Sequence, residues 1–488
     1  MNRTTLSLFA GVAALGALVG FASVSAPDAS GEEPAKAAAT LPVERSSLVC
    51  PAPSTSDLAE TTYTSFTPDT EGAGDKGKAE LLPATGDGKA DKPVLAPKQP
   101  GTPVTAEKSG ADAPALAGTA DGRLAPGWTV QQTTEVTAGT GRGLQGVNCV
   151  APDTDFWFPG VSTDAARTDY VHLVNPDDSA AVVDIELYGK EGALESEVGE
   201  DITVKPHSSE PILLSTLTDE KQPNLTVHVN VRSGRVGAAV QALDDKLGGD
   251  WLPASTDPAG SLVVPGIPKD ATDVRLVVFS PGDSDADLTL RLASPSGLIT
   301  PAGNETLHVK AGMTSAVDLA DVTKGEPGSL VLTPSDESVP VVAAVRVIRS
   351  KGAEQETAFI PATRPVGTRA TVVDNTAKGT TLSLTAPTAA AKVKVTASAG
   401  TEGGETVSKT FAVKSGTTQD VDLPVPDGLK GTYALTLEPE AGGGPVYASR
   451  TLAVSQDDVP AFTVQPVPDD RGTVSVPEAN QDLSVLQR

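Results

Sequence analysis

The residues that carry most enzyme chemistry are scarce in this chain. Its 488 residues include only four histidines and two cysteines. The histidines are His172, His207, His228 and His308, and the patterns around them place them in different strands or at strand ends. No zinc-protease, nucleophile-elbow or phosphate-loop motif occurs. The sequence therefore predicts a protein that is not an enzyme and that uses no cofactor or bound metal.

One acidic segment has the spacing of metal ligands. Asp283, Asp285 and Asp287 stand at every second position, as the first ligands of a calcium loop do. The glycine and the distal glutamate of an EF-hand are missing, and the surrounding letters SPGDS are typical of a hairpin turn. We expect a turn here, with a weak calcium site as the alternative.

The densest aromatic cluster is formed by Phe156, Trp157 and Phe158, in a chain with only 3% aromatic residues. Strand alternation places Trp157 on the face opposite to its two neighbours. Two interpretations follow from this pattern. Trp157 packs in a core or between domains, or the three residues form a binding platform on which a glycan or a partner stacks.

The two cysteines, Cys50 and Cys149, form an even pair in a chain that opens with an export signal. Residues 6–26 carry no charge and follow Met-Asn-Arg, which is the pattern of a secretory signal. Segment 1–26 is therefore a signal peptide or an uncleaved N-terminal anchor. Because export supplies an oxidising compartment, we predict a Cys50–Cys149 disulfide. A reactive thiol pair is the rival interpretation, and no electropositive neighbour favours it.

Residues 68–126 are rich in proline and glycine and contain no aromatic residue. Such a segment buries too little apolar surface to offset the conformational entropy lost on ordering. We therefore expect a disordered, nearly neutral linker at 68–126. The disulfide would make this linker an excursion from an N-terminal unit, with the β-prone segment 61–67 held beside 127–139.

From about residue 151 onward the chain repeats itself. The same pattern follows each of Pro176, Pro281 and Pro387: alternating apolar residues, then a glycine, then a Val-Lys pair. A repeat of about 100 residues indicates tandem domains. Three such domains joined end to end would form a rod on the order of 100 Å long.

Within each repeat the apolar residues alternate with polar ones, as half-buried strands require. Six or seven short strands per repeat, separated by turn residues, are typical of an immunoglobulin-like β-sandwich. We therefore predict an all-β chain of tandem immunoglobulin-like β-sandwiches. The expected divisions are 1–26 for the signal or anchor, 27–67 for an N-terminal β segment with Cys50, 68–126 for the linker, 127–256 for the first sandwich with Cys149, 257–362 and 363–466 for the second and third sandwiches, and 467–488 for a C-terminal tail.

The net charge of the chain is −26, from 63 acidic and 37 basic residues. A surface this acidic repels nucleic acids and anionic lipids. We therefore expect no nucleic-acid partner. We interpret most of the charge as a solvated domain surface. Membrane contact is expected only through an uncleaved N-terminal segment.

Four segments carry a resemblance to a known family: GRGLQGVNCVAPDTDFWFPGVST (141–163), LVCPAP (48–53), HLVNPDDSAAVVDIELYGKEG (172–192) and QDLSVLQR (481–488). They resemble an actinobacterial secreted family catalogued as domain of unknown function 5719. The resemblance implies export, the two cysteines and a multi-domain β architecture. It supplies no activity and no site residues, and the FWFPG pattern also resembles repeats of bacterial surface proteins.

These features lead to two hypotheses for an extracellular or cell-surface protein. The first is a noncatalytic structural or spacer protein of the cell envelope. The second is an adhesin-like binding module for cell-wall glycan or for an envelope protein. The sequence does not distinguish between them, because β-sandwiches serve unrelated functions.

We expect peptide mapping of the secreted protein without reductant to recover Cys50 and Cys149 in one linked pair, because both lie in an exported chain. The control is the same digest after reduction, in which the linked pair disappears. Two thiols that react with an alkylating reagent in the native protein would contradict the prediction.

Overall fold

The computed structural model describes residues 39–86, 92–352, 354–456 and 459–476. The signal or anchor segment 1–26 and the family-like segment 481–488 lie outside the described residues. Within them, the strand pairs from β2 to β34 are antiparallel, and helical structure is limited to short 3₁₀ turns. No helix among these residues has the length and apolarity needed to cross a membrane. The predicted all-β class is confirmed.

The chain divides into two compact units. One unit combines the segments 1–41 and 474–488, and its described part is the pairing of β1 (Ala39–Pro42) with β35 (Thr473–Val476). The other unit, Pro42–Thr473, contains all the remaining strands. The features described below belong to this larger unit.

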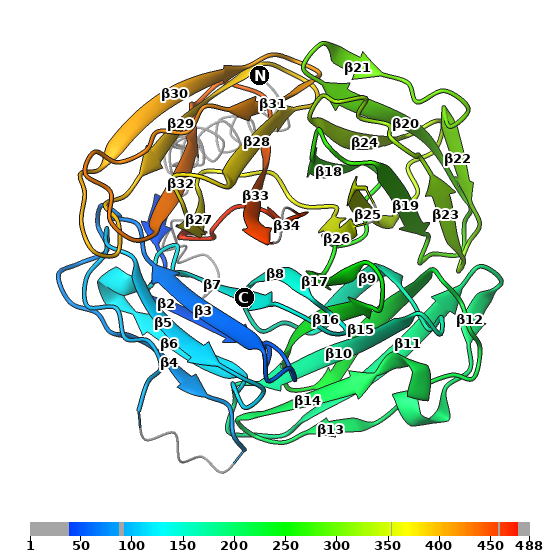
Figure 1. The fold of residues 1–488 in the computed structure, drawn as a ribbon, viewed down its shortest axis with the longest axis horizontal. Helices are drawn as coiled ribbons and strands as arrows, with labels where there is room; N and C mark the ends of the chain where they lie inside the picture. Colours follow the sequence, from blue (N-terminus) through cyan, green and yellow to red (C-terminus); the bar gives the residue numbers. More distant parts are fainter. Residues whose placement is uncertain (1–38, 87–91, 353, 457–458, 477–488) are drawn as a thin grey trace, which may run out of the picture. The chain divides into compact units, whose positions relative to one another are not determined.

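The larger unit holds four β-sandwiches in chain order (Figure 1). The first consists of β2 (Arg45–Cys50), β3 (Ala59–Phe66), β4 (Ala79–Pro83), β5 (Val104–Ser109), β6 (Leu116–Asp121), β7 (Thr129–Val136) and β8 (Gly143–Asn148). The second consists of β9 (Asp155–Val161), β10 (Arg167–Asn175), β11 (Ala181–Gly189), β12 (Gly192–Leu194), β13 (Ile202–Val204), β14 (Ser208–Leu213), β15 (Leu225–Ser233), β16 (Gly237–Asp244) and β17 (Gly248–Leu252).

The other two sandwiches follow the same plan. The third consists of β18 (Leu262–Ile267), β19 (Asp273–Phe279), β20 (Ala286–Ser294), β21 (Gly297–Ile299), β22 (Thr306–Val309), β23 (Thr314–Asp318), β24 (Gly328–Pro334), β25 (Val342–Lys351) and β26 (Glu354–Pro361). The fourth consists of β27 (Ala370–Asn375), β28 (Thr380–Ala386), β29 (Ala391–Ala397), β30 (Val407–Val413), β31 (Thr417–Val421), β32 (Tyr433–Pro439), β33 (Tyr447–Gln456) and β34 (Val459–Pro466).

All four sandwiches share one strand order. In the first, one sheet runs β2-β6-β4 and the other runs β5-β3-β7-β8. The corresponding sheets of the second are β9-β15-β11 and β14-β10-β16-β17, and those of the third are β18-β24-β20 and β23-β19-β25-β26. The fourth has β27-β32-β29 and β31-β28-β33-β34. Extra strands extend the first sheet in the last three sandwiches: β12 and β13, β21 and β22, and β30.

The N-terminal region is therefore a fourth copy of the repeat, where the sequence indicated three. Its strand β3 pairs with β7, which confirms that 61–67 lies beside 127–139. Since β7 and β8 complete this N-terminal sandwich, the sandwich expected at 127–256 begins only after Cys149, at β9. The strands of the other two repeats fall within the ranges expected for them.

The prediction of a disordered linker at 68–126 is wrong for the described residues. This segment supplies the strands β4, β5 and β6, and it places Leu81, Leu95 and Leu116 in the core of the first sandwich. Leu81 and Leu116 are fully buried. The segment is poor in apolar residues, but the ones it has stand at strand positions that face a core completed by Tyr63 and Trp128 from outside the segment. The amino-acid composition of the segment does not reveal that its few apolar residues face one core.

The sandwiches are not joined end to end. The last strand of each sandwich contacts the last strand of the next: β8 contacts β17, β17 contacts β26, and β26 contacts β34. β34 in turn contacts β8, so the fourth sandwich returns to the first (Figure 1). The expected rod is therefore wrong within Pro42–Thr473, where the four repeats lie side by side around one set of inner strands.

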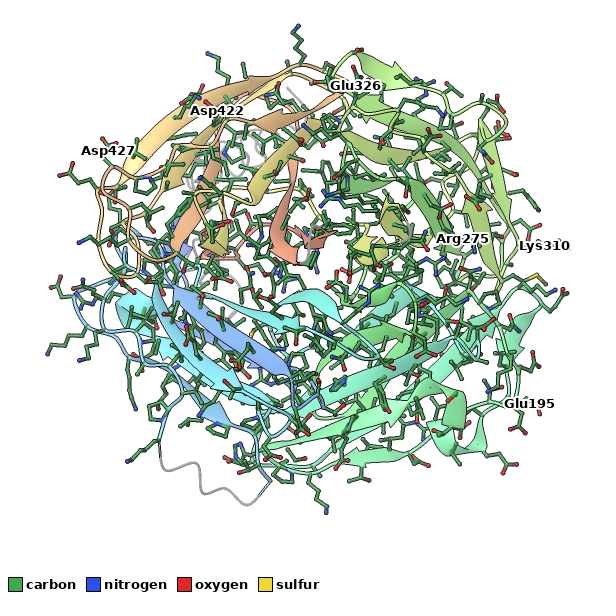
Figure 2. All side chains as sticks on the ribbon, in the orientation of Figure 1. Glu195, Arg275, Lys310, Glu326, Asp422 and Asp427 are labelled. Atoms are coloured by element: carbon green, nitrogen blue, oxygen red, sulfur yellow. A yellow bond between two sulfur atoms is a disulfide. The ribbon has the colours of Figure 1, made fainter. Side chains whose placement is uncertain are left out.

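Acidic side chains lie on the outer strands and turns of the sandwiches. Glu195, Glu326 and Asp427 are exposed and extend away from the inner strands (Figure 2). Charged groups at these positions keep their hydration, so their placement carries little energetic cost. The interpretation of the net charge as a solvated surface agrees with this placement.

Candidate functional site

A fully buried carboxylate lies where the four inner strands meet, a region we call the central contact. Asp250 on β17 is fully buried. It accepts hydrogen bonds from the backbone N–H of Gly146 on β8 at 3.0 Å and from the hydroxyl of Thr463 on β34 at 3.1 Å. The backbone N–H groups of Phe359 on β26 and of Trp251 also donate to it. Asp250 thus contacts an inner strand of every sandwich.

Close backbone approach makes this arrangement possible. A Cβ atom at Gly146 would lie 2.6 Å from the Thr463 side chain, so no larger residue fits there without displacement.

Burial raises the pKa of Asp250 well above its usual value, while its hydrogen bonds act in the opposite direction and are the smaller effect. The carboxylate has no solvent access, so a dissolved substrate does not reach it. We interpret the central contact as structural.

An ion pair beside the central contact joins the first three sandwiches. Arg142, next to β8, donates to the carboxylate of Glu356 on β26. The same guanidinium donates to the carbonyl oxygens of Lys246 at 2.9 Å and Gln355 at 3.2 Å. Burial raises the pKa of Glu356 to about 7, and Arg142 opposes that rise. Arg142 therefore supports the contact between sandwiches that are distant in sequence.

Replacing Asp250 by Ala should destabilise the larger unit by at least about 3 kcal/mol, because each buried donor left without an acceptor costs about 1–3 kcal/mol. The free energy of unfolding from urea denaturation tests this. Asp250→Asn should also destabilise, since its NH₂ group would face donors. The matched control is Asp283→Ala, in an exposed turn. Equal stability of Asp250→Ala and the wild type would contradict the role of the carboxylate.

The predicted aromatic cluster is buried at the junction of the second and third sandwiches. Phe156 and Phe158 lie in the core of the second sandwich, and Trp157 lies on the opposite face. Trp157 is only 8% exposed and packs against Tyr188 and Phe279. We call Trp157, Tyr188 and Phe279 the aromatic wedge. The burial agrees with a wedge between domains and contradicts an exposed binding platform.

Polar groups complete the aromatic wedge. The ring of Trp157 stacks on His228 with 3.8 Å between centroids. Glu186 lies 2.8 Å from His228 Nδ1 and accepts a hydrogen bond from the Tyr188 hydroxyl at 2.7 Å. Burial opposes ionisation of Glu186, but these hydrogen bonds outweigh it and lower its pKa. The carboxylate of Glu186 therefore links the Tyr188 hydroxyl to the His228 ring at the rim of the wedge.

Removing the indole with Trp157→Ala should lower the free energy of unfolding by about 3–5 kcal/mol, as is usual for a buried aromatic residue. Differential scanning calorimetry and urea unfolding measure the loss. Trp157→Phe, which keeps a ring against Phe279, is the matched control and should cost less. Unchanged unfolding of the Ala variant would show that the wedge contributes nothing.

The other histidines and the acidic turn do not assemble into a reactive site. His172 is buried, and burial lowers its pKa to about 4. His207 lies 2.7 Å from a carboxylate oxygen of Asp178 in an exposed turn. His308 is held by Asp287 at 2.8 Å. Within the part of the chain that the structure describes, no three side chains are grouped as metal ligands.

The acidic segment around Asp283 is a turn between strands. Asp285 accepts a hydrogen bond from the backbone N–H of Ala311 at 2.9 Å, which ties the β19–β20 turn to the residues before β23. Asp283 is exposed. The expected turn is present, but it is not a hairpin, because β19 and β20 belong to the two different sheets of the third sandwich.

The Cys50–Cys149 disulfide is confirmed. It joins the last residue of β2 to the residue that follows β8, with 4.5 Å between the Cα atoms. Val49 and Val150 exchange backbone hydrogen bonds of 2.8 and 3.0 Å beside it. The bridge therefore fastens the first and last strands of the first sandwich to each other, and it indicates an oxidising compartment.

A surface groove lies at the junction of the first and second sandwiches. Its volume is about 230 Å³. Its floor is the outward face of β4 and β6, with Leu82 and Ala117, and its rim includes Glu80, Thr119 and His207. None of its lining residues is lysine or arginine. Apolar floor and hydrogen-bonding rim together suit a small ring-shaped group that carries a polar substituent.

Sequence reasoning missed both Asp250 and the groove. Asp250 stands in GGDWL, an acidic residue in a short glycine-flanked strand with no turn chemistry after it. That signal was available, because a charge within a buried strand needs partners. The groove gave no signal, because its residues come from segments that were expected to be a linker and from turns of the next repeat.

Fold and geometry define an all-β protein of tandem β-sandwiches with an internal disulfide. The chain belongs to a family of unknown function, DUF5719, whose sequence model matches residues 104–424. No curated protein and no solved structure matches the chain.

Proposed function

We propose that this chain is an exported, noncatalytic binding protein of the cell envelope. The observation that carries the proposal is the closure of the four sandwiches through β8, β17, β26 and β34. Sandwiches that meet at their inner strands cannot project one another outward, so the arrangement favours a binding protein over the spacer hypothesis. The outer strands and the junctions between sandwiches are left as surface for partners.

Export is part of this proposal. The apolar segment 6–26 and the disulfide both support an extracellular or cell-surface location. The seven strands shared by every sandwich, divided three and four between two antiparallel sheets, support an immunoglobulin-like topology. Actinobacterial origin rests on the resemblance in sequence alone.

The absence of catalysis is likewise proposed. In the described residues, the groups with most potential for acid-base chemistry already have structural roles. Asp250 joins the inner strands, and His228 stacks on Trp157 while its Nδ1 lies 2.8 Å from the carboxylate of Glu186. Wall glycan or an envelope protein is the expected class of partner.

The proposal predicts that the mature secreted protein, at physiological salt, co-sediments with intact envelope fragments and saturates a finite number of sites. Fragments stripped of protein and, separately, of polysaccharide identify which component is bound. The control is the protein unfolded by reduction and urea. If the folded protein sediments with no fraction at any concentration tested, the binding function is wrong and the structural hypothesis replaces it.

A further inference from the structure

The first sandwich does not share its apolar core with its neighbours. Ala344 and Phe359 of the third sandwich belong to the core of the second. In the same way, Phe462 and Val464 of the fourth belong to the core of the third. Among the described residues, the core around Tyr63 contains only side chains of the first sandwich itself. Separation of the first sandwich from a neighbour therefore divides no continuous core, and the hydrophobic effect opposes it less than elsewhere.

The fourth sandwich meets the first at a junction that we call the seam, where β27 contacts β3 and β7 (Figure 1). The chain runs directly from each sandwich to the next, so the seam is the one junction within Pro42–Thr473 that no chain segment crosses. The buried apolar cluster in its outer part comprises Phe66, Val373 and Ala434. Noncovalent contacts alone therefore close the seam.

Polar side chains supply several of these contacts. Gln131 and Thr133 on β7 are buried, and the Gln131 amide donates to the Thr133 hydroxyl at 3.0 Å. That hydroxyl donates to the carboxylate of Asp374 on β27 at 2.7 Å. Arg369 of the fourth sandwich donates to the hydroxyl of Thr70 at 2.8 Å. Because water can replace each of these partners, the hydrogen bonds oppose separation less than a shared core does.

The backbone at Asp374 is strained. Its φ of 59° lies in the left-handed region, which favours glycine. The register of β27 with β32 and of β18 with β24 aligns Asp374 with Gly266, at the junction of the third and fourth sandwiches. A Cβ atom at Gly266 would overlap the Ser449 hydroxyl, whereas the seam has room for a whole aspartate side chain at the same place. The seam is therefore packed less closely there, and the hydrogen bond from Thr133 offsets the strain of Asp374.

The opposite face of the first sandwich borders the groove described above. The seam lies on the sheet β5-β3-β7-β8, whereas the groove lies on β4 and β6 of the other sheet, opposite Pro176 and His207 of the second sandwich. Leu144 on the inner strand β8 packs against Leu452 and Ala461 of the fourth sandwich. A small rotation of the first sandwich about this inner strand would widen the outer part of the seam and narrow the groove, whose volume of about 230 Å³ leaves room for the movement.

We propose that the closed ring of four sandwiches opens reversibly at the outer part of the seam, while the central contact stays intact and acts as the hinge. The hydrogen bond between Thr133 and Asp374 holds the seam closed, and both side chains reach water once it breaks. This inference concerns a motion of the first sandwich, and it does not depend on the proposed binding function.

Thiol labelling of variants with one added cysteine tests the opening in the intact mature protein. Ala434→Cys reports on the seam, and Ala293→Cys is the matched control, because Ala293 is also fully buried and packs in the apolar cluster between the third and fourth sandwiches. The native cysteines are joined in a disulfide and do not compete for the reagent. With DTNB under native conditions, we expect Ala434→Cys to react at least about tenfold faster than Ala293→Cys, because local opening costs less free energy than global unfolding.

Equal labelling rates in the two variants would overturn the proposal, because global unfolding exposes both positions alike. If Ala434→Cys does not fold, Val373→Cys replaces it, with Val263→Cys as the control at the third–fourth junction. The same difference in rate is expected for this second pair.

Two further substitutions test the hydrogen bond and the rotation. Thr133→Val removes the hydroxyl at nearly constant volume and should raise the labelling rate of Ala434→Cys at least about threefold, without change for Ala293→Cys. Thr119→Trp fills the groove from an exposed position and should slow the labelling of Ala434→Cys, whereas Thr306→Trp, at an exposed strand position of the third sandwich, should not. An unchanged rate with Thr133→Val would overturn the role of the hydrogen bond, and an unchanged rate with Thr119→Trp would overturn the rotation toward the groove.

Urea distinguishes opening of the seam from unfolding. Opening exposes little new surface, so the labelling rate of Ala434→Cys should change little below the unfolding transition, while that of Ala293→Cys should rise steeply. A steep rise in both variants would show that only global unfolding exposes the seam, and the proposal would fail.

Discussion

The closure of the larger unit depends on one buried carboxylate. Asp250 gathers donors from β8, β26 and β34 at the point where four sandwiches meet, and burial of a carboxylate is tolerated only when it is well supplied with hydrogen bonds. Gly146 permits the close approach that the geometry needs. The same interaction restricts the rotation of the sandwiches against one another, together with the Arg142 ion pair and the aromatic wedge.

Much of the fold could be predicted from local patterns. The alternation of apolar and polar residues predicted the strands, because it depends only on neighbouring positions in the chain. The cysteine pair and the export signal predicted the disulfide, because an oxidising compartment favours its formation. The fourth repeat was hidden because 68–126 has few apolar residues, and only the pairing of Leu81 and Leu116 with residues outside the segment shows that those few suffice. The side-by-side arrangement depends on contacts between β8 and β34, more than 300 residues apart, which no local pattern encodes.

The candidate site was less accessible to sequence reasoning. Alternation correctly separated Trp157 from Phe156 and Phe158, yet whether its outward face met solvent or a neighbour depended on where the third sandwich lies. The groove is subtler, because β4 and β6 of the first sandwich line it together with Pro176 and His207 of the second, and no local pattern in either segment indicates that they meet.

The return of β34 to β8 also limits how the gene for such a protein can change. In an open row of repeats, each unit touches only its neighbours, so copies can be gained or lost with modest effect. Here the angles between sandwiches add up to a full circle with four copies. Deletion of the first or the fourth copy would leave two inner strands without a neighbour and would remove the Gly146 or the Thr463 donor of Asp250. Copy number is therefore expected to be constant among relatives, while the residues at each junction vary.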